Sequence, residues 1–455
     1  MTWGDILLMF VLFLGIIFLI IISFILGEKD IVNPIFLCCA GFFLSIICAY
    51  YNVTTWGINL CNETVMLIFF SLLVMVIVSF LVINLTGNIC NKYARPGKKI
   101  SGPEAVSYIE VDTYKYVLVI LLAVFTAGMY IRDIITITKS SGYISGAGIQ
   151  ALMRVYRLAT HFKEAEGSNR ISRYTVYSMD LLRAFAYICT YIGINNILTA
   201  DSRRKQIRNL RNFVIAFLFC VVNLLTGSRM QILKLVIFFA VVYLILQKRK
   251  NGWDKTVKLS TVLKIGGLVA LALILFVQIR GLVGRETDTD PLYYITSYAG
   301  GSIEGLDLFI KEPIEKSALW GKESFYAMYN YLGKWFDFNG ESFLFAKEFR
   351  RSNGVGVGNI YTALRCFYYD FGFWGCLACC GIVSAVFSLV YAFIRFKPSD
   401  QPVDMKLLLY GYFSYTYVMF CINYYFDYLT PAIVKMLICF FIGRWFMTKF
   451  KAEFS

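Results

Sequence analysis

The stretch that decides the fold is residues 259–309, which read LSTVLKIGGLVALALILFVQIR and then GLVGRETDTDPLYYITSYAGGSIEGLDLF. The first part is an apolar run long enough to cross a bilayer. The second part opens a polar segment, 281–357, with eight Lys/Arg and eleven Asp/Glu side chains and many Tyr, Phe and Gly. A connection of this length is usually functional, and its aromatic residues indicate that it folds. We therefore expect a membrane domain that holds a folded loop against the bilayer surface.

Composition supports an all-α polytopic membrane protein. Hydrophobic residues make up 58% of the 455-residue chain and charged residues only 16%. The net charge of +15 would suggest nucleic acid in a soluble chain, but here it indicates basic cytoplasmic loops and contact with a lipid bilayer. Most of the 13 Cys lie in apolar runs, where they behave as small hydrophobic residues. We expect no nucleic acid partner, no metal and no cofactor.

Apolar runs of roughly 20 residues predict about eleven transmembrane helices. The runs are 6–26, 31–51, 64–87, 116–131, 175–199, 212–225, 230–246, 259–279, 373–395, 407–426 and 429–447. Three parts of the chain follow from them: residues 1–280 with the first eight helices and an outer segment at 132–174, residues 281–372 as a large extracytoplasmic loop, and residues 373–455 with the last three helices and a cytoplasmic tail.

The distribution of Lys and Arg orients these helices. The short links 88–115, 200–211 and 247–258 are rich in Lys and Arg, and positively charged short loops remain in the cytoplasm. Segments 132–174 and 281–357 then lie outside. Because the C-terminal tail is cytoplasmic, an odd number of helices places the N-terminus outside as well.

Two arginines stand where apolar runs meet the outer surface. Arg229 ends the turn Thr226-Gly227-Ser228 and opens the run at 230–246, while Arg280 ends the run at 259–279. An arginine at this level either extends to the headgroups or binds an anion with its forked donors. Position alone leaves both interpretations open.

Residues 149–165 form an amphipathic stretch in the first outer segment. In a helix, Arg154, Arg157 and His161 share one face. A face of this kind binds anionic lipid at a membrane surface, or it serves a phosphate site. His161 is the one His of the chain, and an imidazole suits proton transfer near neutral pH.

A further pattern follows the large loop. Asn359-Ile360-Tyr361-Thr362 precedes Asp370-Phe371-Gly372 and Gly375, directly before an apolar run. The Asp-Phe-Gly triplet lacks the glycine-rich loop and the His-Arg-Asp sequence that a kinase requires. Arg365 and Asp370 are spaced to pair across a turn of the entering helix.

Together these motifs resemble the oligosaccharide repeat-unit polymerases, the Wzy-type O-antigen and capsule polymerases. The pattern at 359–375, the Thr-Gly-Ser-Arg turn at 226–229 and the sequence Tyr-Ala-Gly-Gly-Ser at 298–302 are similar to that family, as is the layout of helices and loops. The resemblance implies a metal-independent glycosyltransferase of the GT-C type in a bacterial cytoplasmic (inner) membrane. Its substrate would be an undecaprenyl-pyrophosphate-linked oligosaccharide, and its partners a chain-length regulator and a flippase.

The resemblance also assigns roles to residues. In the transition state the departing diphosphate gathers negative charge, which arginines at the membrane surface stabilise. The arginines at this depth are Arg229, Arg280 and Arg285, with Arg154 and Arg157 as a second phosphate clamp. The general base is one of Glu304, Asp307 and His161. The substrate-binding residues expected from the motif are Asn359, Tyr361, Thr362, Arg365 and Asp370.

Two alternatives remain. An O-antigen ligase transfers finished glycan with similar architecture and chemistry, and the pattern at 359–375 favours the polymerase over it. A flippase or transporter is the second alternative, and it would use polar residues within the membrane such as Asp180 and Arg183.

Overall fold

A computed structural model gives the fold and describes residues 3–92, 106–141, 148–161, 171–284, 289–333, 335–338, 347–399, 401–426, 430 and 432–448. The secondary structure is almost entirely helical. In chain order the elements are α1 (Trp3–Leu26), α2 (Pro34–Tyr51), α3 (Val53–Trp56), α4 (Asn62–Lys92), α5 (Thr113–Ser140), α6 (Gly148–His161), α7 (Arg173–Thr199), α8 (Arg203–Asn209), α9 (Arg211–Leu224), α10 (Met230–Asn251), α11 (Leu259–Gln278), the 3-10 turn η1 (Gly281–Val283), α12 (Pro291–Lys311), α13 (Tyr326–Leu332), β1 (Arg350–Ser352), β2 (Val355–Gly358), α14 (Leu364–Phe396), α15 (Met405–Val418) and α16 (Ala432–Thr448).

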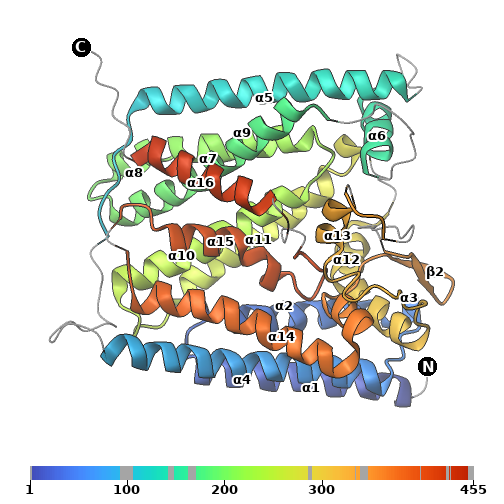
Figure 1. Ribbon diagram of the computed structural model, residues 1–455. Coiled ribbons are helices and arrows are strands. Elements are labelled where there is room, and N and C mark those ends of the chain that lie inside the picture. The colour runs from blue at the N-terminus through green and yellow to red at the C-terminus, as the bar shows by residue number, and fades with distance from the viewer. Residues whose placement is uncertain are drawn as a thin grey trace, which may run out of the picture.

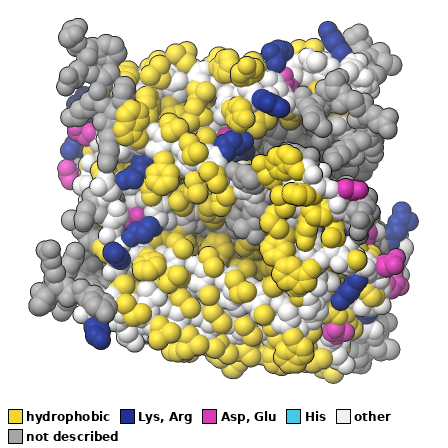
Figure 2. Space-filling view, viewed as in Figure 1, with side chains coloured by type: hydrophobic (Ala, Val, Ile, Leu, Met, Phe, Trp, Pro, Cys, Tyr) yellow, Lys and Arg dark blue, Asp and Glu magenta, His cyan; other side chains and the backbone are white. Residues whose placement is uncertain are grey.

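Nine helices within the described ranges are long and apolar enough to cross a membrane. They are α1, α2, α4, α5, α7, α8 and α9 taken together, α10, α11 and α14. The long helices lie side by side along one direction (Figure 1), and hydrophobic side chains are spread over the face of the helices seen in Figure 2, with few charged ones among them. The chain is therefore an all-α, multi-pass membrane protein.

The last two predicted helices are shorter than expected. α15 has 14 residues and α16 has 17. The prediction of one helix over 407–426 was wrong at its end, because the helix stops at Val418. The carbonyl of Phe420 instead accepts a hydrogen bond from the backbone N–H of Ala363, at 2.9 Å, so the chain after α15 lies against the segment before α14.

The connections between the long helices gather at two ends (Figure 1). We call the end with α3, α6, α12, α13 and the β1–β2 hairpin the loop end. The described parts of the basic links 88–115, 200–211 and 247–258 lie at the opposite end. There, Arg249 in the last turn of α10 pairs at 2.6 Å with Asp404, which directly precedes α15. The neighbouring Lys250 donates to the carbonyl of Leu198.

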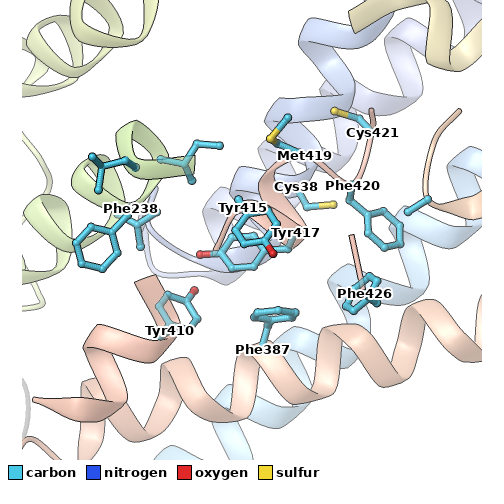
Figure 3. Packing of buried hydrophobic residues seen from close by; sticks show 14 of the residues in the cluster. Cys38, Phe238, Phe387, Tyr410, Tyr415, Tyr417, Met419, Phe420, Cys421 and Phe426 are labelled. Atoms are coloured by element: carbon cyan, nitrogen blue, oxygen red, sulfur yellow. The ribbon is translucent and has the colours of Figure 1, made fainter. Parts of the chain in front are cut away.

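Small polar side chains hold α4 and α14 together. The hydroxyl of Ser384 donates to the carbonyl of Met75 at 2.6 Å, and Ser388 donates to Ser79 at 2.8 Å. Small residues allow close helix contact in a membrane, where hydrophobic burial alone gives little preference for one pairing. Deeper in the bundle, aromatic rings of α14 and α15 fill the interior (Figure 3), with the rings of Phe387 and Tyr417 4.8 Å apart.

The large loop folds, as its aromatic content predicted. Its helix α12 packs on the end of α2, where an added Cβ at Gly300 would lie 2.4 Å from the backbone N of Ala49. β1 and β2 form an antiparallel hairpin through Asn353 and Gly354, which both have positive φ. An Asn-Gly pair is the preferred sequence for such a two-residue turn. The loop is therefore anchored to the membrane helices by a helix and a hairpin.

Candidate functional site

Arg229 lies at the loop end, directly before α10, and is only 2% exposed. Its guanidinium donates to the carbonyl of Phe276 on α11 and, at 2.6 Å, to the hydroxyl of Tyr294 on α12. The guanidinium carbon also lies 4.0 Å from the centroid of the Phe276 ring. A snorkelling arginine keeps its charged group among the lipid headgroups. This side chain is instead inside the protein, where it joins three helices.

Arg280, at the end of α11, approaches the same tyrosine. Its guanidinium carbon lies 5.3 Å from the centroid of the Tyr294 ring, and that of Arg229 lies 5.5 Å from it. Arg280 is also buried. Aromatic rings attract cations, which helps to hold two positive groups against one side chain. The two charges still repel each other, so this arrangement favours an anion beside them.

Arg154 and Arg157 lie on α6, next to the turns that carry the other two arginines. An added Cβ at Gly284 would be 2.5 Å from the backbone N of Arg154, and one at Gly227 would be 3.8 Å from the Cβ of Arg157. Buried Tyr156 and Met153 face α5, so α6 has the amphipathic arrangement that its sequence predicts. We call Arg154, Arg157, Arg229 and Arg280 the arginine corner.

Two predicted site residues fall outside this description. Arg285 lies outside the described residues, as does the side chain of His161 at the end of α6. The structure therefore assigns neither of them a place in the arginine corner.

Glu304 and Asp307 lie further along α12, in different surroundings. Asp307 accepts from the backbone N–H of Cys61 at 2.8 Å and pairs with Lys311 at 2.7 Å. Glu304 lies 2.7 Å from the hydroxyl of Ser352, and its other carboxyl oxygen has no hydrogen-bond partner among the described residues. Burial raises the pKa of Glu304 to about 7, against the opposing effect of its bond to Ser352.

Glu304 shares its hydroxyl partner with a backbone carbonyl. The Ser352 hydroxyl lies 2.7 Å from both Glu304 and the carbonyl of Trp56. One hydroxyl proton serves one of these two acceptors at a time, so Ser352 compensates the burial of Glu304 only in part. Glu304 and Tyr294 are ten residues apart on α12, a rise of about 15 Å. The structure thus keeps Glu304 away from the arginine corner.

Arg365 occupies a separate cluster in the large loop. It is 1% exposed, pairs with Glu323 and, at 2.7 Å, with Glu348, and packs against the rings of Phe309 and Tyr361. Burial alone would raise the pKa of Glu348, but the neighbouring Arg365 lowers that pKa below its ordinary value. Two carboxylates thus balance this arginine, and together they hold the loop to the start of α14.

The expected pairing of Arg365 with Asp370 was wrong. Asp370 accepts from the backbone N–H groups of Glu323 and Ser324, at 3.2 and 2.6 Å. Tyr361 and Thr362 are buried, whereas Asn359 is partly exposed. The 359–370 motif is therefore in contact with the loop residues 323–324 and 348, and its side chains are largely enclosed.

These features define the class of protein as a multi-pass helical membrane protein with a folded loop and a basic corner at one end. Comparison with protein-family models, with curated proteins and with solved structures gives no match. Within the described ranges, no three His, Cys, Asp or Glu side chains lie close enough together to hold a metal ion. Chemically, the arginine corner offers several forked cations to an oxyanion such as a phosphate.

Proposed function

We propose that the protein is a glycosyltransferase that polymerises undecaprenyl-pyrophosphate-linked oligosaccharide repeat units at the outer leaflet of a bacterial cytoplasmic membrane. The observation that supports this most is the arginine corner. Arg229 of the α9–α10 turn and Arg280 at the end of α11 meet beside Tyr294 of the large loop, and α6 brings Arg154 and Arg157 next to the turns at Gly284 and Gly227. Four cations at one end of a membrane domain suit the diphosphate of a lipid-linked sugar.

The proposed architecture adds α15 and α16 to the nine long helices, giving eleven membrane helices arranged as in GT-C enzymes. The positive-inside rule makes the loop end extracytoplasmic, because the basic links lie at the opposite end. Under this orientation the arginine corner faces the leaflet where lipid-linked repeat units are displayed.

In the proposed reaction, a sugar hydroxyl of one unit attacks the anomeric carbon of another. The bond from that carbon to the diphosphate breaks, the new glycosidic bond forms, and the hydroxyl proton passes to a base. Negative charge grows on the departing diphosphate, where fixed guanidinium groups lower the barrier. Arg229 and Arg280 have this role, with Arg154 and Arg157 beside them. Glu304 lies too far along α12 to be the base at the same reacting atoms.

The test is the lipid-linked glycan content of cells that lack the gene. A polymerase defect leaves single repeat units at the outer leaflet, without long chains. A ligase defect instead accumulates long polymer on undecaprenyl pyrophosphate, and a flippase defect keeps single units on the cytoplasmic leaflet. Long lipid-linked polymer in the deletion strain would overturn the polymerase assignment in favour of the ligase.

A further inference from the structure

Trp320 of the large loop is an exposed aromatic residue in a fixed position. It is 70% exposed. Its ring stacks on that of Phe325, with centroids 5.7 Å apart, and lies 5.0 Å from the ring of Phe371 on α14. The carbonyl of Trp320 accepts a hydrogen bond from the hydroxyl of Tyr329 at 2.8 Å. The indole is therefore held by rings of the protein while most of its surface is left uncovered.

A glycine turn makes this support possible. Gly321, directly after the tryptophan, has a φ of +67°, a conformation that an L side chain adopts only with strain. An added Cβ there would lie 2.5 Å from the ring of Phe325 and 3.4 Å from that of Phe371. The turn thus lets the chain approach both rings closely. It fixes an apolar side chain outward, where water gives it none of the stabilisation of burial.

The exposed face of α14 shows where the lipid lies. From Trp374 onward, its exposed residues are apolar and recur every three or four positions, which places them on one side of the helix. They are Trp374, Ala378, Ile382, Val386, Leu389 and Phe393. Ser384 and Ser388, which are buried, bond instead to α4. The exposed residues therefore form the lipid-facing stripe of α14.

Trp374 is the residue of this stripe nearest the loop end, and it is 80% exposed. Tryptophan is enriched at the level of the lipid headgroups, where its ring meets the acyl chains and its N–H meets water. Trp374 therefore marks the membrane boundary on α14. Phe371 precedes it by three residues, and Phe371 is the residue of α14 that the Trp320 ring contacts. Trp320 thus reaches α14 directly beside this boundary.

The neighbouring part of the loop lies at the same level. α13, which follows Trp320, does not project beyond the ends of the long helices, whereas the β1–β2 hairpin extends beyond α13 at this end (Figure 1). Ile314 and Met328, on either side of Trp320 in the sequence, are further exposed hydrophobic residues. The hairpin exposes the charged side chain of Arg351. The loop therefore has an apolar part near the membrane helices and a polar part further out.

We infer that the loop segment around Trp320 lies on the bilayer surface, with the indole inserted among the lipid headgroups beside Trp374. The partner is the lipid bilayer because the lipid-facing stripe of α14 leads directly to Phe371, against which the indole packs. The inference rests on the membrane fold and not on the polymerase proposal. A sugar ring that stacks on Trp320 from the water is the competing partner, and the experiment distinguishes the two.

The experiment measures tryptophan fluorescence of the full-length protein in phosphatidylcholine vesicles, with and without lipid brominated close to the headgroup. The emission of Trp320 is the difference between wild-type and Trp320→Phe protein. Bromine quenches at short range, so we expect brominated lipid to remove most of this emission, as it does for Trp374 measured with Trp374→Phe. Iodide in the water should quench it much less. Trp253, which is buried at the opposite end, is the control and should respond little to either quencher.

Two fluorescence results would overturn the inference. Quenching of the Trp320 emission by iodide and not by brominated lipid would place the ring in water, with a sugar as the alternative partner. Quenching by neither would mean that the protein covers the ring.

A second measurement uses unaltered protein and so does not depend on the folding of variants. Lipid that carries a photoreactive diazirine close to the headgroup should label residues 317–325 and Trp374, and leave the hairpin residues 350–358 unlabelled. Labelling of the hairpin without labelling of 317–325 would contradict the inference. Both measurements contain no glycan and follow no transfer, so their failure is separate from failure of the proposed polymerase.

Discussion

Two groups of buried arginines lie at the loop end, and they are arranged differently. Arg365 contacts two carboxylates, those of Glu323 and Glu348, which cancel its charge and hold the loop to the start of α14. Arg229 and Arg280 instead bring two guanidinium groups to one aromatic ring, that of Tyr294. The first arrangement serves stability, whereas two cations gathered at one ring suit an anionic ligand in the proposed function.

The largest effect is expected at Arg365. Arg365→Gln removes the guanidinium from two carboxylates, and Glu323 then keeps Lys347, at 3.0 Å, as a cationic partner. The loss of two charge-assisted hydrogen bonds, at about 1.5–3 kcal/mol each, costs about 3–5 kcal/mol of unfolding free energy. Thermal unfolding in detergent and protein level in the membrane measure the loss. Arg351→Gln, at an exposed position in the nearby hairpin, is the control and stays close to wild type. A stable Arg365→Gln protein would end the structural interpretation of this cluster.

The same comparison can be made for the two buried carboxyls of α12. Asp307 pairs with the cation of Lys311, whereas Glu304 contacts the neutral hydroxyl of Ser352. A glutamate has an ordinary pKa of about 4.3, and in the folded protein burial raises the pKa of Glu304 to about 7. The folded state therefore binds this proton more tightly than the unfolded chain. Stability falls as pH rises from about 4.3 to about 7 and then levels off.

Glu304→Gln removes this dependence because an amide stays neutral at every pH. Relative to wild type, the variant gains stability as the pH rises, by about 2–3 kcal/mol between pH 5 and pH 8. Unfolding temperatures at the two pH values measure the difference. Glu312→Gln, at an exposed side chain on the same loop, is expected to show no such trend. A constant difference between Glu304→Gln and wild type would mean that Glu304 is ionised throughout.

A change at Arg229 tests the other side of the comparison. Arg229→Lys keeps the charge but loses the planar fork that contacts Phe276 and Tyr294. We expect normal protein in the membrane and roughly tenfold slower chain elongation, equivalent to about 1.4 kcal/mol of transition-state stabilisation. Polysaccharide chain length on gels measures it, with Arg203→Lys on exposed α8 as control. If Arg229→Lys protein at a normal level produced chains of wild-type length, Arg229 would have a role in packing only.

The smallest effect is expected at Tyr294. Tyr294→Phe keeps the ring between Arg229 and Arg280 and removes only the hydroxyl that accepts from Arg229. Loss of one such hydrogen bond costs about 1 kcal/mol, or roughly fivefold in rate. Tyr329→Phe, which removes an exposed hydroxyl that donates to the carbonyl of Trp320, is the matched control. An equal effect of the two substitutions would contradict a special role for Tyr294.

Hydrophobic runs were sufficient to locate the long helices, because each run spans a bilayer by itself. The end of α15 was missed, since residues 419–426 remain apolar and aromatic after the helix stops. Just beyond the helix, the carbonyl of Phe420 bonds to Ala363 of a segment that is distant in sequence, and such a contact has no local signal. Asp180 and Arg183 are three residues apart on one helix, a spacing that suits an ion pair, and the structure has them paired at 3.2 Å.

The candidate site was less predictable. The sequence marked Arg229, Arg280, Arg154 and Arg157 individually, from their positions near apolar runs. Their meeting at Tyr294 and the two glycine turns depends on how α6 and α12 pack, which has no local signal. The partners of Arg365 also lack a local signal: Glu323 and Glu348 come from distant parts of the loop and take the place of Asp370. The ion pair between Lys435 of α16 and Asp180 of α7 likewise depends on how two helices pack.

The break within α14 has a consequence for which residue can occupy it. Gly372 has φ +66° and ψ −169°, a backbone conformation open essentially to glycine alone. An added Cβ there would meet no other atom within 4 Å. The position therefore selects by backbone handedness and not by side-chain size: L-alanine would be strained although its Cβ has space, whereas the mirror-image residue, D-alanine, adopts this backbone conformation without strain. Substitution by even the smallest L residue should disturb the junction between the loop and the membrane helix as much as a large one.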